Sequence, residues 1–436
     1  MPTTTGFLGQ VGTLDWVTDQ RPKSWRQGIL LLFPNGRAPL TGLMSAMKSE
    51  SITDSEHSWW TQALPNQSGA VTNTFNDADL TGAYTEGTGA AGDIIYHQVA
   101  AAVAKEFRVG HQILTRDDSQ LEDDFNCEVT SVVINGASST IGCKLLEADG
   151  GSGHTIDRVY IVGSINSEGA AMPDVVSYQP TKQYNYTQIW RNALDTTGTA
   201  LATTLRTGDH YRELKRQTLE LHSIEMEKTA FWGVRTEGTG TNGKPKRTAE
   251  GCVSYLRRVL SGNEADYVTD TSTSANGKTW IAGGMDWLNE QLELLFRYAD
   301  GDIVAFAGSA AVLGIQRLAS TYGQLTLTSS QTGFGTNVTT WVTPFGSVDI
   351  ITHPLWSYET STQNSMFLMN PRSASFKALK GRDTFFRSDP NRNQRTKTGD
   401  FGLDGIKEEY LTEGTFEWTH GEQMMLLNGL NKDNTN

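Results

Sequence analysis

The sequence predicts an α+β protein, and three stretches carry that prediction. Residues 207–233 form the one long uninterrupted helical pattern of the chain. Residues from about 105 to 165 hold short strand patterns separated by turn residues, which is typical of a small antiparallel β module. Residues 285–319 alternate helix, strand and helix, which indicates an α/β subdomain.

Composition excludes several classes of function. A chain of 436 residues suggests about three domains at roughly 150 residues each. Its net charge of −13 argues against a dedicated nucleic-acid binder, which needs a basic face. The three cysteines show no CxxC spacing, so we expect buried thiols in a reducing compartment. Without a leader pattern or a long apolar run, the sequence predicts a soluble cytosolic protein.

The first 50 residues lack a clear period and are expected to form an extended arm. Trp16, Trp25 and Phe33 are scattered aromatic anchors in a segment without a core of its own. Such a tail usually packs on another surface. The next pattern, residues 55–64, predicts a strand with Trp59 and Trp60 on opposite faces. These tryptophans either belong to a core and an interface or line a sugar site.

The β module follows from four strand patterns and the turns between them. Asn135-Gly136 and the Gly-rich turn at 149–151 are strong hairpin signals. The expected strands cover residues 108–115, 127–134, 140–146 and 156–162.

The long helix is expected to begin after Asp209, whose carboxylate can cap free backbone N–H groups, and to end at Gly233. Its apolar residues fall on two stripes, which predicts a helix clamped between layers. One stripe contains Leu214, Leu221, Ile224 and Phe231, and the other contains Leu219, Met226 and Ala230. Glu213, Glu220 and Glu227 recur every seven residues and are expected to form a charged edge facing water or a neighbouring chain.

The rest of the chain alternates between helix and strand patterns. Helices are expected at 285–298 and 310–319, with a buried strand at 302–307 between them. Residues 338–351 predict two strands around Pro344-Phe345-Gly346. Residues 410–418 alternate like a half-buried strand, and Gly414 suggests a bulge.

No motif in the sequence supports catalysis, a cofactor or a metal. Residues 238–245 resemble a phosphate-binding loop, but Pro245 stands where a hydroxyl is needed and the segment follows a helix, so a loop is expected. The eight histidines lack ligand spacing, and His210 and His222 are too far apart to share a metal. Acidic pairs such as Glu225 and Glu227 are inevitable among 49 acidic residues. We therefore assign no catalytic, cofactor-binding or metal residues.

Two charge clusters leave two interpretations open: solvated loops, or complementary docking between copies of the chain. The acidic cluster contains Asp117, Asp118, Glu122, Asp123 and Asp124. The basic cluster at 371–398 contains Arg372, Lys377, Lys380, Arg382, Arg387, Arg392, Arg395 and Lys397.

The order of these elements resembles the major capsid proteins of tailed bacteriophages, which share the Hong Kong 97-like fold. The resemblance covers most of the chain and depends on motifs occurring in the same order. These are RAPLTGLM (37–44), SEHSWWTQAL (55–64), YNYTQIWRNALDTTGTA (184–200), IEMEKTAFWG (224–233), KRTAEGCVSYL (246–256), TPFGSVDIITHPLW (343–356) and EEYLTEGTFEWTHGEQMMLLNGL (408–430).

The resemblance implies an order of domains. An N-terminal arm (1–52) precedes an extension loop (53–200), which is enlarged here by the β module. A peripheral domain (201–279) contains the spine helix at 207–233. An axial domain (280–360) follows, and residues 361–436 return to the peripheral domain.

The resemblance also implies a structural protein of the virion and not an enzyme. Copies of the chain would form hexamers and pentamers of an icosahedral head around double-stranded DNA, without sequence-specific binding and without a membrane. Scaffolding protein, portal, maturation protease and decoration protein are the implied partners, and the host cytoplasm is the implied place of assembly. We expect non-covalent stabilisation of the shell. The alternative function is a carbohydrate-binding or tail-fibre adhesin, suggested by the tryptophans and the β module.

Overall fold

The computed structural model describes residues 50–62, 65, 67–120, 123–149, 155–203, 209–299, 303–322, 327–333, 336–388 and 405–435, with side chains described outside 322–338. It divides the chain into two compact units. The small unit is Trp60–Lys182, and the large unit contains the described residues before and after it. The arm predicted at 1–52 falls outside the described residues except for its last three residues. Of those three, Ser51–Ile52 form the short strand β1.

The long helix α4 covers His210–Trp232, as predicted. The Asp209 carboxylate accepts a hydrogen bond from the Tyr211 backbone N–H at 3.0 Å, which caps the start of the helix. Gly233 ends it at a place where a side chain would not fit. A Cβ atom there would lie 2.4 Å from the Ala249 carbonyl oxygen.

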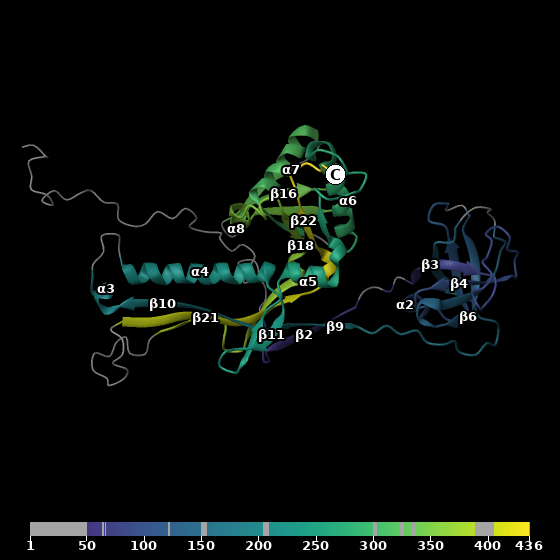
Figure 1. Cartoon of the computed structure of the whole chain (residues 1–436), viewed down its shortest axis with the longest axis horizontal. Coiled ribbons are helices and arrows are strands. Elements are labelled where there is room, and N and C mark those ends of the chain that lie inside the picture. The colour runs from purple at the N-terminus through teal and green to yellow at the C-terminus, as the bar shows by residue number, and fades with distance from the viewer. Residues whose placement is uncertain are drawn as a thin grey trace, which may run out of the picture. The chain divides into compact units, whose positions relative to one another are not determined.

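Helix α4 lies along a five-stranded sheet of the large unit (Figure 1). This sheet has the order β1-β19-β21-β10, and β20 also pairs with β21. Its centre is the antiparallel ladder of β10 and β21, which runs without a shift from Gln188↔Gly414 to Thr197↔Gly405. The strands are β19 (Ala374–Leu379), β20 (Phe385–Arg387), β21 (Gly405–Trp418) and β10 (Gln188–Thr197).

Two details of this sheet differ from the predictions. Residues 410–416 of β21 are buried at every position, so the strand is not half-buried as its alternating pattern predicts. Gly414 marks no bulge. The register continues through it, and a Cβ atom there would lie 2.5 Å from the Phe376 ring. The glycine is needed for close packing.

A seven-stranded mixed sheet forms the second layer of the large unit, in the order β13-β22-β18-β14-β17-β16-β15. Every residue of β14 is buried, as expected for a central strand with both faces covered. The strands are β13 (Glu264–Asp266), β14 (Ile303–Ala307), β15 (Leu327–Gly333), β16 (Thr336–Val342), β17 (Ser347–Thr352), β18 (Met366–Met369) and β22 (Met424–Asn428).

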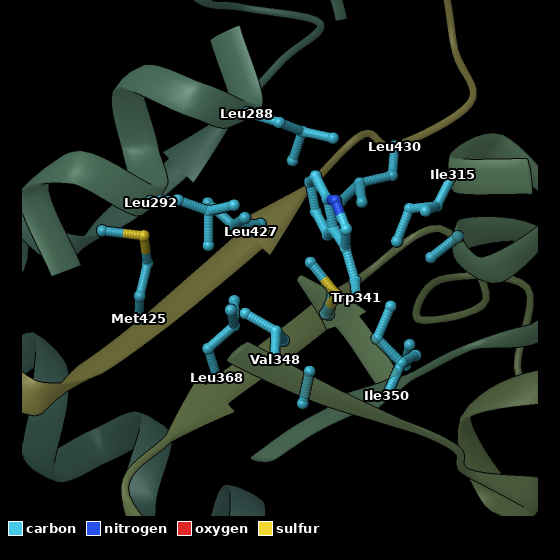
Figure 2. Close-up of a cluster of buried hydrophobic side chains, with 14 of the residues drawn as sticks. Leu288, Leu292, Ile315, Trp341, Val348, Ile350, Leu368, Met425, Leu427 and Leu430 are labelled. Atoms are coloured by element: carbon cyan, nitrogen blue, oxygen red, sulfur yellow. The ribbon is translucent and has the colours of Figure 1, made fainter. Parts of the chain in front are cut away.

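Helices α6 (Trp280–Phe296) and α7 (Ser309–Tyr322) confirm the predicted helix–strand–helix alternation. They cover one face of the seven-stranded sheet. Figure 2 shows Leu288 and Leu292 of α6 and Ile315 of α7 meeting strand residues such as Val348 and Leu427.

The opposite face of the same sheet is covered by the end of α4 and by two short helices, α5 (Cys252–Val259) and α8 (Pro354–Tyr358). Phe231 of α4 is the centre of this layer. Its ring lies 5.8 Å from Phe306, 5.0 Å from Trp356 and 6.1 Å from Phe367. Alternating residues of β14, β18 and β22 therefore serve two separate cores.

The small unit contains a closed six-stranded antiparallel barrel in the order β3-β4-β7-β6-β5-β8. Four of its strands match the predicted β module. The other two, β3 and β4, lie before residue 105, so the module is larger than predicted. The elements are β3 (Ser68–Phe75), β4 (Ile94–Val99), α2 (Ala101–Ala104), β5 (His111–Arg116), β6 (Phe125–Val133), β7 (Ser139–Leu145) and β8 (Arg158–Ser164).

Two two-stranded pairs, one short α-helix and four short 3-10 helices are the remaining elements of the described residues. β2 (Glu56–Thr61) pairs with β9 (Thr181–Tyr186), where the chain leaves and re-enters the large unit. β11 (Thr236–Thr239) and β12 (Pro245–Thr248) form a hairpin, and α3 (Gly198–Ala202) precedes α4. No helix among the described residues is long and apolar enough to cross a membrane.

Candidate functional site

Among the described residues, the C-terminal half of α4 and helix α8 combine buried polar contacts, a cavity and exposed aromatic side chains, so this region is the candidate recognition site. On its sheet side, α4 is held by specific polar contacts. His222 Nδ1 lies 2.6 Å from Asn192 Oδ1, and its Nε2 lies 2.7 Å from Thr412 Oγ1. Burial lowers the pKa of His222, although Glu225 opposes this effect. The neutral ring therefore fixes the helix on the sheet.

On the other side of α4, Glu227 and His353 form a fully buried pair. Glu227 Oε1 lies 2.8 Å from His353 Nε2, and neither side chain is exposed. His353 also caps α8, because its Nδ1 accepts a hydrogen bond from the Trp356 backbone N–H at 3.4 Å. This leaves Nε2 as the donor toward Glu227. One histidine thus joins α8 to α4.

This pair corrects the prediction for the long helix. Glu227 was expected on a charged edge with Glu213 and Glu220, but it is buried. Only Glu213 and Glu220 remain on the surface, where both pair with Arg216. The clamp is also incomplete. The apolar residue Leu221 is 57% exposed, because nothing in the described chain covers that side of α4.

A cavity of about 680 Å³ opens beside the buried pair. Its volume is within the usual range of ligand pockets, about 300–1,000 Å³. Trp232, at the end of α4, is 40% exposed and packs on Trp356 at a centroid distance of 5.9 Å. Tyr358 of α8 is 61% exposed. The lining also includes Phe231, Lys228, Arg257, Glu359 and Leu426.

An exposed stripe of α4 continues from this cavity. Leu221, Glu225, Lys228 and Trp232 are all exposed and follow one another at helical spacing, so they share one face of the helix. Together, the cavity and this stripe form a partly apolar surface, which we call the α4–α8 surface.

Three of the five described members of the predicted basic cluster form ion pairs within the chain, whereas no ion pair is seen for Arg372 and Lys380 among the described residues. Lys377 pairs with Glu50 and Glu417, Arg382 with Glu413, and Arg387 with Glu409. Arg392, Arg395 and Lys397 lie outside the described residues.

The acidic cluster is likewise held mainly by local contacts. Arg116 pairs with Asp124, and Arg158 with Asp118. Hydrogen bonds from Ser119 and from the Thr155 backbone lower the pKa of Asp117 to about 2. Glu122 lies outside the described residues. For the members of both clusters that these contacts hold, a structural role is favoured over docking.

The residues considered for chemistry do not come together. Among the described residues, no group of three His, Cys, Asp or Glu side chains could hold a metal ion. Residues 238–245 form the β11–β12 hairpin, so strand leads to strand and not to a helix, as a phosphate-binding loop requires. Cys127, Cys143 and Cys252 are free and buried. Burial raises the pKa of Cys127 to about 12, which keeps it a protonated thiol.

The adjacent tryptophans are separated by the alternation of β2. Trp59 is buried and its ring lies 6.4 Å from Tyr255, whereas Trp60 is exposed. Only one of the two is accessible, so they do not form a paired sugar platform.

Sequence reasoning missed the α4–α8 surface. Most of its parts come from residues 221–232 and 353–365, which are more than 120 positions apart. One local signal was available. His353 followed by Pro354 is a helix start, because proline is favoured at the first helical position.

Comparison with known proteins matches the chain to a family and to a sequence relative. The model of the family described as "SU10 major capsid protein" matches residues 2–431. The major capsid protein of Pseudomonas phage PaMx41 is 25% identical over 338 residues, which cover 77% of this chain and 73% of the relative.

Similar solved structures include one from a phage and one from an encapsulin. The structure from Microbacterium phage Oxtober96 covers 94% of this chain and 95% of its own, at 9% identity and a TM-score of 0.43. The SrpI encapsulin of Synechococcus elongatus PCC 7942 covers 58% and 76%, at 13% identity and a TM-score of 0.39.

The family match spans nearly the whole chain, and it confirms the predicted resemblance to phage major capsid proteins. It gives the chain a structural role in the virion, as a subunit that assembles with copies of itself into a shell. It gives no support to the adhesin alternative. The chain belongs to the SU10 major capsid protein family.

Proposed function

We propose that copies of this chain form the hexamers and pentamers of an icosahedral phage head that encloses double-stranded DNA, in a Hong Kong 97-like arrangement. The observation that carries this proposal is the family match, which covers residues 2–431. Large apolar side chains that stay exposed outside the α4–α8 surface, such as Trp60 and Ile189, support it, because a subunit that completes its layers with neighbours needs such surfaces.

The proposed domains follow the order predicted from the sequence. Residues 1–52 form the arm, and 53–200 the extension loop that carries the barrel. Residues 201–279 form the peripheral domain around α4, to which 361–436 return, and 280–360 form the axial domain. The return is supported by contacts of residues 361–436 with residues 201–279, since β22 pairs with β13 and Thr412 of β21 contacts His222 of α4.

The proposed partners are a scaffolding protein, a portal, a maturation protease and a decoration protein, with assembly in the host cytoplasm. The DNA is enclosed without being read. A net charge of −13 supports this, because an acidic subunit does not neutralise phosphates.

Negative-stain electron microscopy of the full chain, expressed alone and with its phage's scaffolding protein, tests the proposal. We expect rings, shells or tubes of repeated units in at least one sample. Compact isolated particles in both samples, together with a monomer mass by light scattering, would overturn it.

A further inference from the structure

We propose that the N-terminal segment 21–33 docks on the α4–α8 surface and places Trp25 in the aromatic cavity. The inference deepens the proposed function and rests on it for the assignment of an arm. The surface itself stands on the geometry of α4 and α8.

The first argument is that this surface is incomplete. The cavity has room for several side chains, and aromatic residues at its rim are exposed, among them Trp232 and Tyr358. Leu221 extends the apolar surface along α4. Aromatic rings left open around a cavity are typical of a recognition site for an apolar anchor.

The second argument is that segment 21–33 has the matching chemistry. It ends in the run Ile29-Leu30-Leu31-Leu32-Phe33, and Trp25 stands just before this run. A run of five large apolar residues is stable in water only when it packs against another apolar surface. A tryptophan followed by an apolar run fits a cavity that continues into an apolar stripe.

The third argument is charge complementarity. Residues 1–49 contain five basic and two acidic residues, a net charge of +3, whereas the rest of the chain carries −16. Three of those cations, Arg21, Lys23 and Arg26, surround Trp25. Among the described residues, Glu225 beside the cavity and Glu359 in its lining have no ion-pair partner, and Lys228 is the one unpaired cation there. Opposite charges at the rim set the register of docking.

The fourth argument is reach. The described chain begins at Glu50, whose carboxylate lies 3.2 Å from Lys377 Nζ on β19, in the large unit. The 17 residues from Phe33 to Glu50 can span at most about 60 Å when extended. The 23 residues of α4 measure about 35 Å. Residues 33–50, when extended, are therefore longer than α4, so they can bring segment 21–33 to the α4–α8 surface.

A rival occupant is the exposed segment 165–180. Its Met172 is 90% exposed and its Val175 is 85% exposed. However, its only charged side chains are Glu168 and Asp174, which Glu225 and Glu359 would repel. Charge therefore favours segment 21–33.

Photo-crosslinking tests the docking in the full-length protein. Tyr358 is replaced by p-benzoylphenylalanine, the sample is irradiated, and crosslinked peptides are identified by mass spectrometry. We expect crosslinks to residues 21–33, and we expect Trp25→Ala to lower their yield at least fivefold while Trp16→Ala leaves it unchanged. The control replaces Tyr298, which is 55% exposed and lies outside the cavity lining, and is expected to give no such crosslinks.

Crosslinks from position 358 to residues 165–180 alone, or to no segment of the chain, would overturn the inference. So would an equal yield from position 298. Electron microscopy of the same samples separates this result from the proposed function. Shells without the 21–33 crosslink contradict only the docking, whereas the crosslink in samples that never form shells contradicts only the shell.

Discussion

The two faces of the seven-stranded sheet are covered in different ways. Toward α6 and α7, strand residues such as Ala305, Leu368 and Leu427 meet a core that is almost wholly apolar (Figure 2). Toward α4, α5 and α8, their neighbours Val304, Phe367 and Leu426 meet a core that also buries the Glu227–His353 pair.

The difference shows how one sheet can support two kinds of packing. The apolar core gains stability from area removed from water, which is non-directional. The mixed core gains less per group, because burying charges costs solvation, but a wrong arrangement is penalised more strongly. The mixed core is also the one that lies beside the uncovered α4–α8 surface, where a fixed geometry matters for recognition.

The largest expected loss of stability comes from a substitution in the apolar core between the seven-stranded sheet and helices α6 and α7. Trp287 of α6 is fully buried, and its Nε1 donates to Asp270 Oδ2 at 2.5 Å. We expect Trp287→Ala to lower the free energy of unfolding by about 4–5 kcal/mol, through lost burial and the cavity that remains. Thermal and denaturant unfolding measure this effect. Trp60→Ala, at an exposed tryptophan, is the matched control and should change stability by less than about 0.5 kcal/mol.

The next largest expected loss of stability comes from the buried Glu227–His353 pair of the mixed core. Glu227→Ala leaves His353 without its acceptor and should cost about 3 kcal/mol in unfolding free energy. Glu227→Gln keeps an acceptor oxygen for the His353 Nε2–H and should cost only about 1 kcal/mol. Denaturant unfolding compares the two variants. Equal losses would mean that the volume of the side chain, and not the pairing, is what matters here.

The smallest expected effect concerns His97, a buried histidine that has no carboxylate partner and can therefore be compared with His353. His97 in the barrel contacts Thr74 Oγ1 through Nδ1 at 3.0 Å, and no described group pairs with its Nε2. Burial lowers its pKa from 6.5 to about 4. The unfolded chain then binds more protons as the pH falls below 6.5, so stability is lost on acidification.

Between pH 7 and pH 5 this loss should be about 2 kcal/mol for His97 alone. Hydrogen exchange of the β4 amides at both pH values measures it in the full chain. His97→Gln should remove most of this pH dependence. A variant that keeps the wild-type slope would show that other groups cause it.

Local patterns predicted the elements whose reasons are local. Asp209 and Gly233 mark the ends of α4, since a cap and a close backbone approach depend on a few neighbouring residues. The βα alternation predicted α6, β14 and α7 for the same reason. The strands of the barrel from β5 to β8 were also predicted, because turn residues separate them.

Contacts between distant residues were not predictable in this way. Glu227 fits a heptad of surface carboxylates, and only its pairing with His353, 126 positions away, explains why it is buried. Strand β3 consists mainly of small and polar residues, so its place in the barrel depends on β4 and β8. The α4–α8 surface depends on the same kind of long-range contact.

The pairing of β2 with β9 has a consequence for how this chain can change. The hydroxyl of Thr61 lies 3.5 Å from the Thr181 carbonyl oxygen, so the barrel segment leaves and returns at one place. A segment anchored at two adjacent points can be shortened, exchanged or replaced by a foreign domain while the ends of the host protein stay where they are. Residues 62–180 therefore form a replaceable insertion, and a guest domain whose termini lie close together could be grafted in their place.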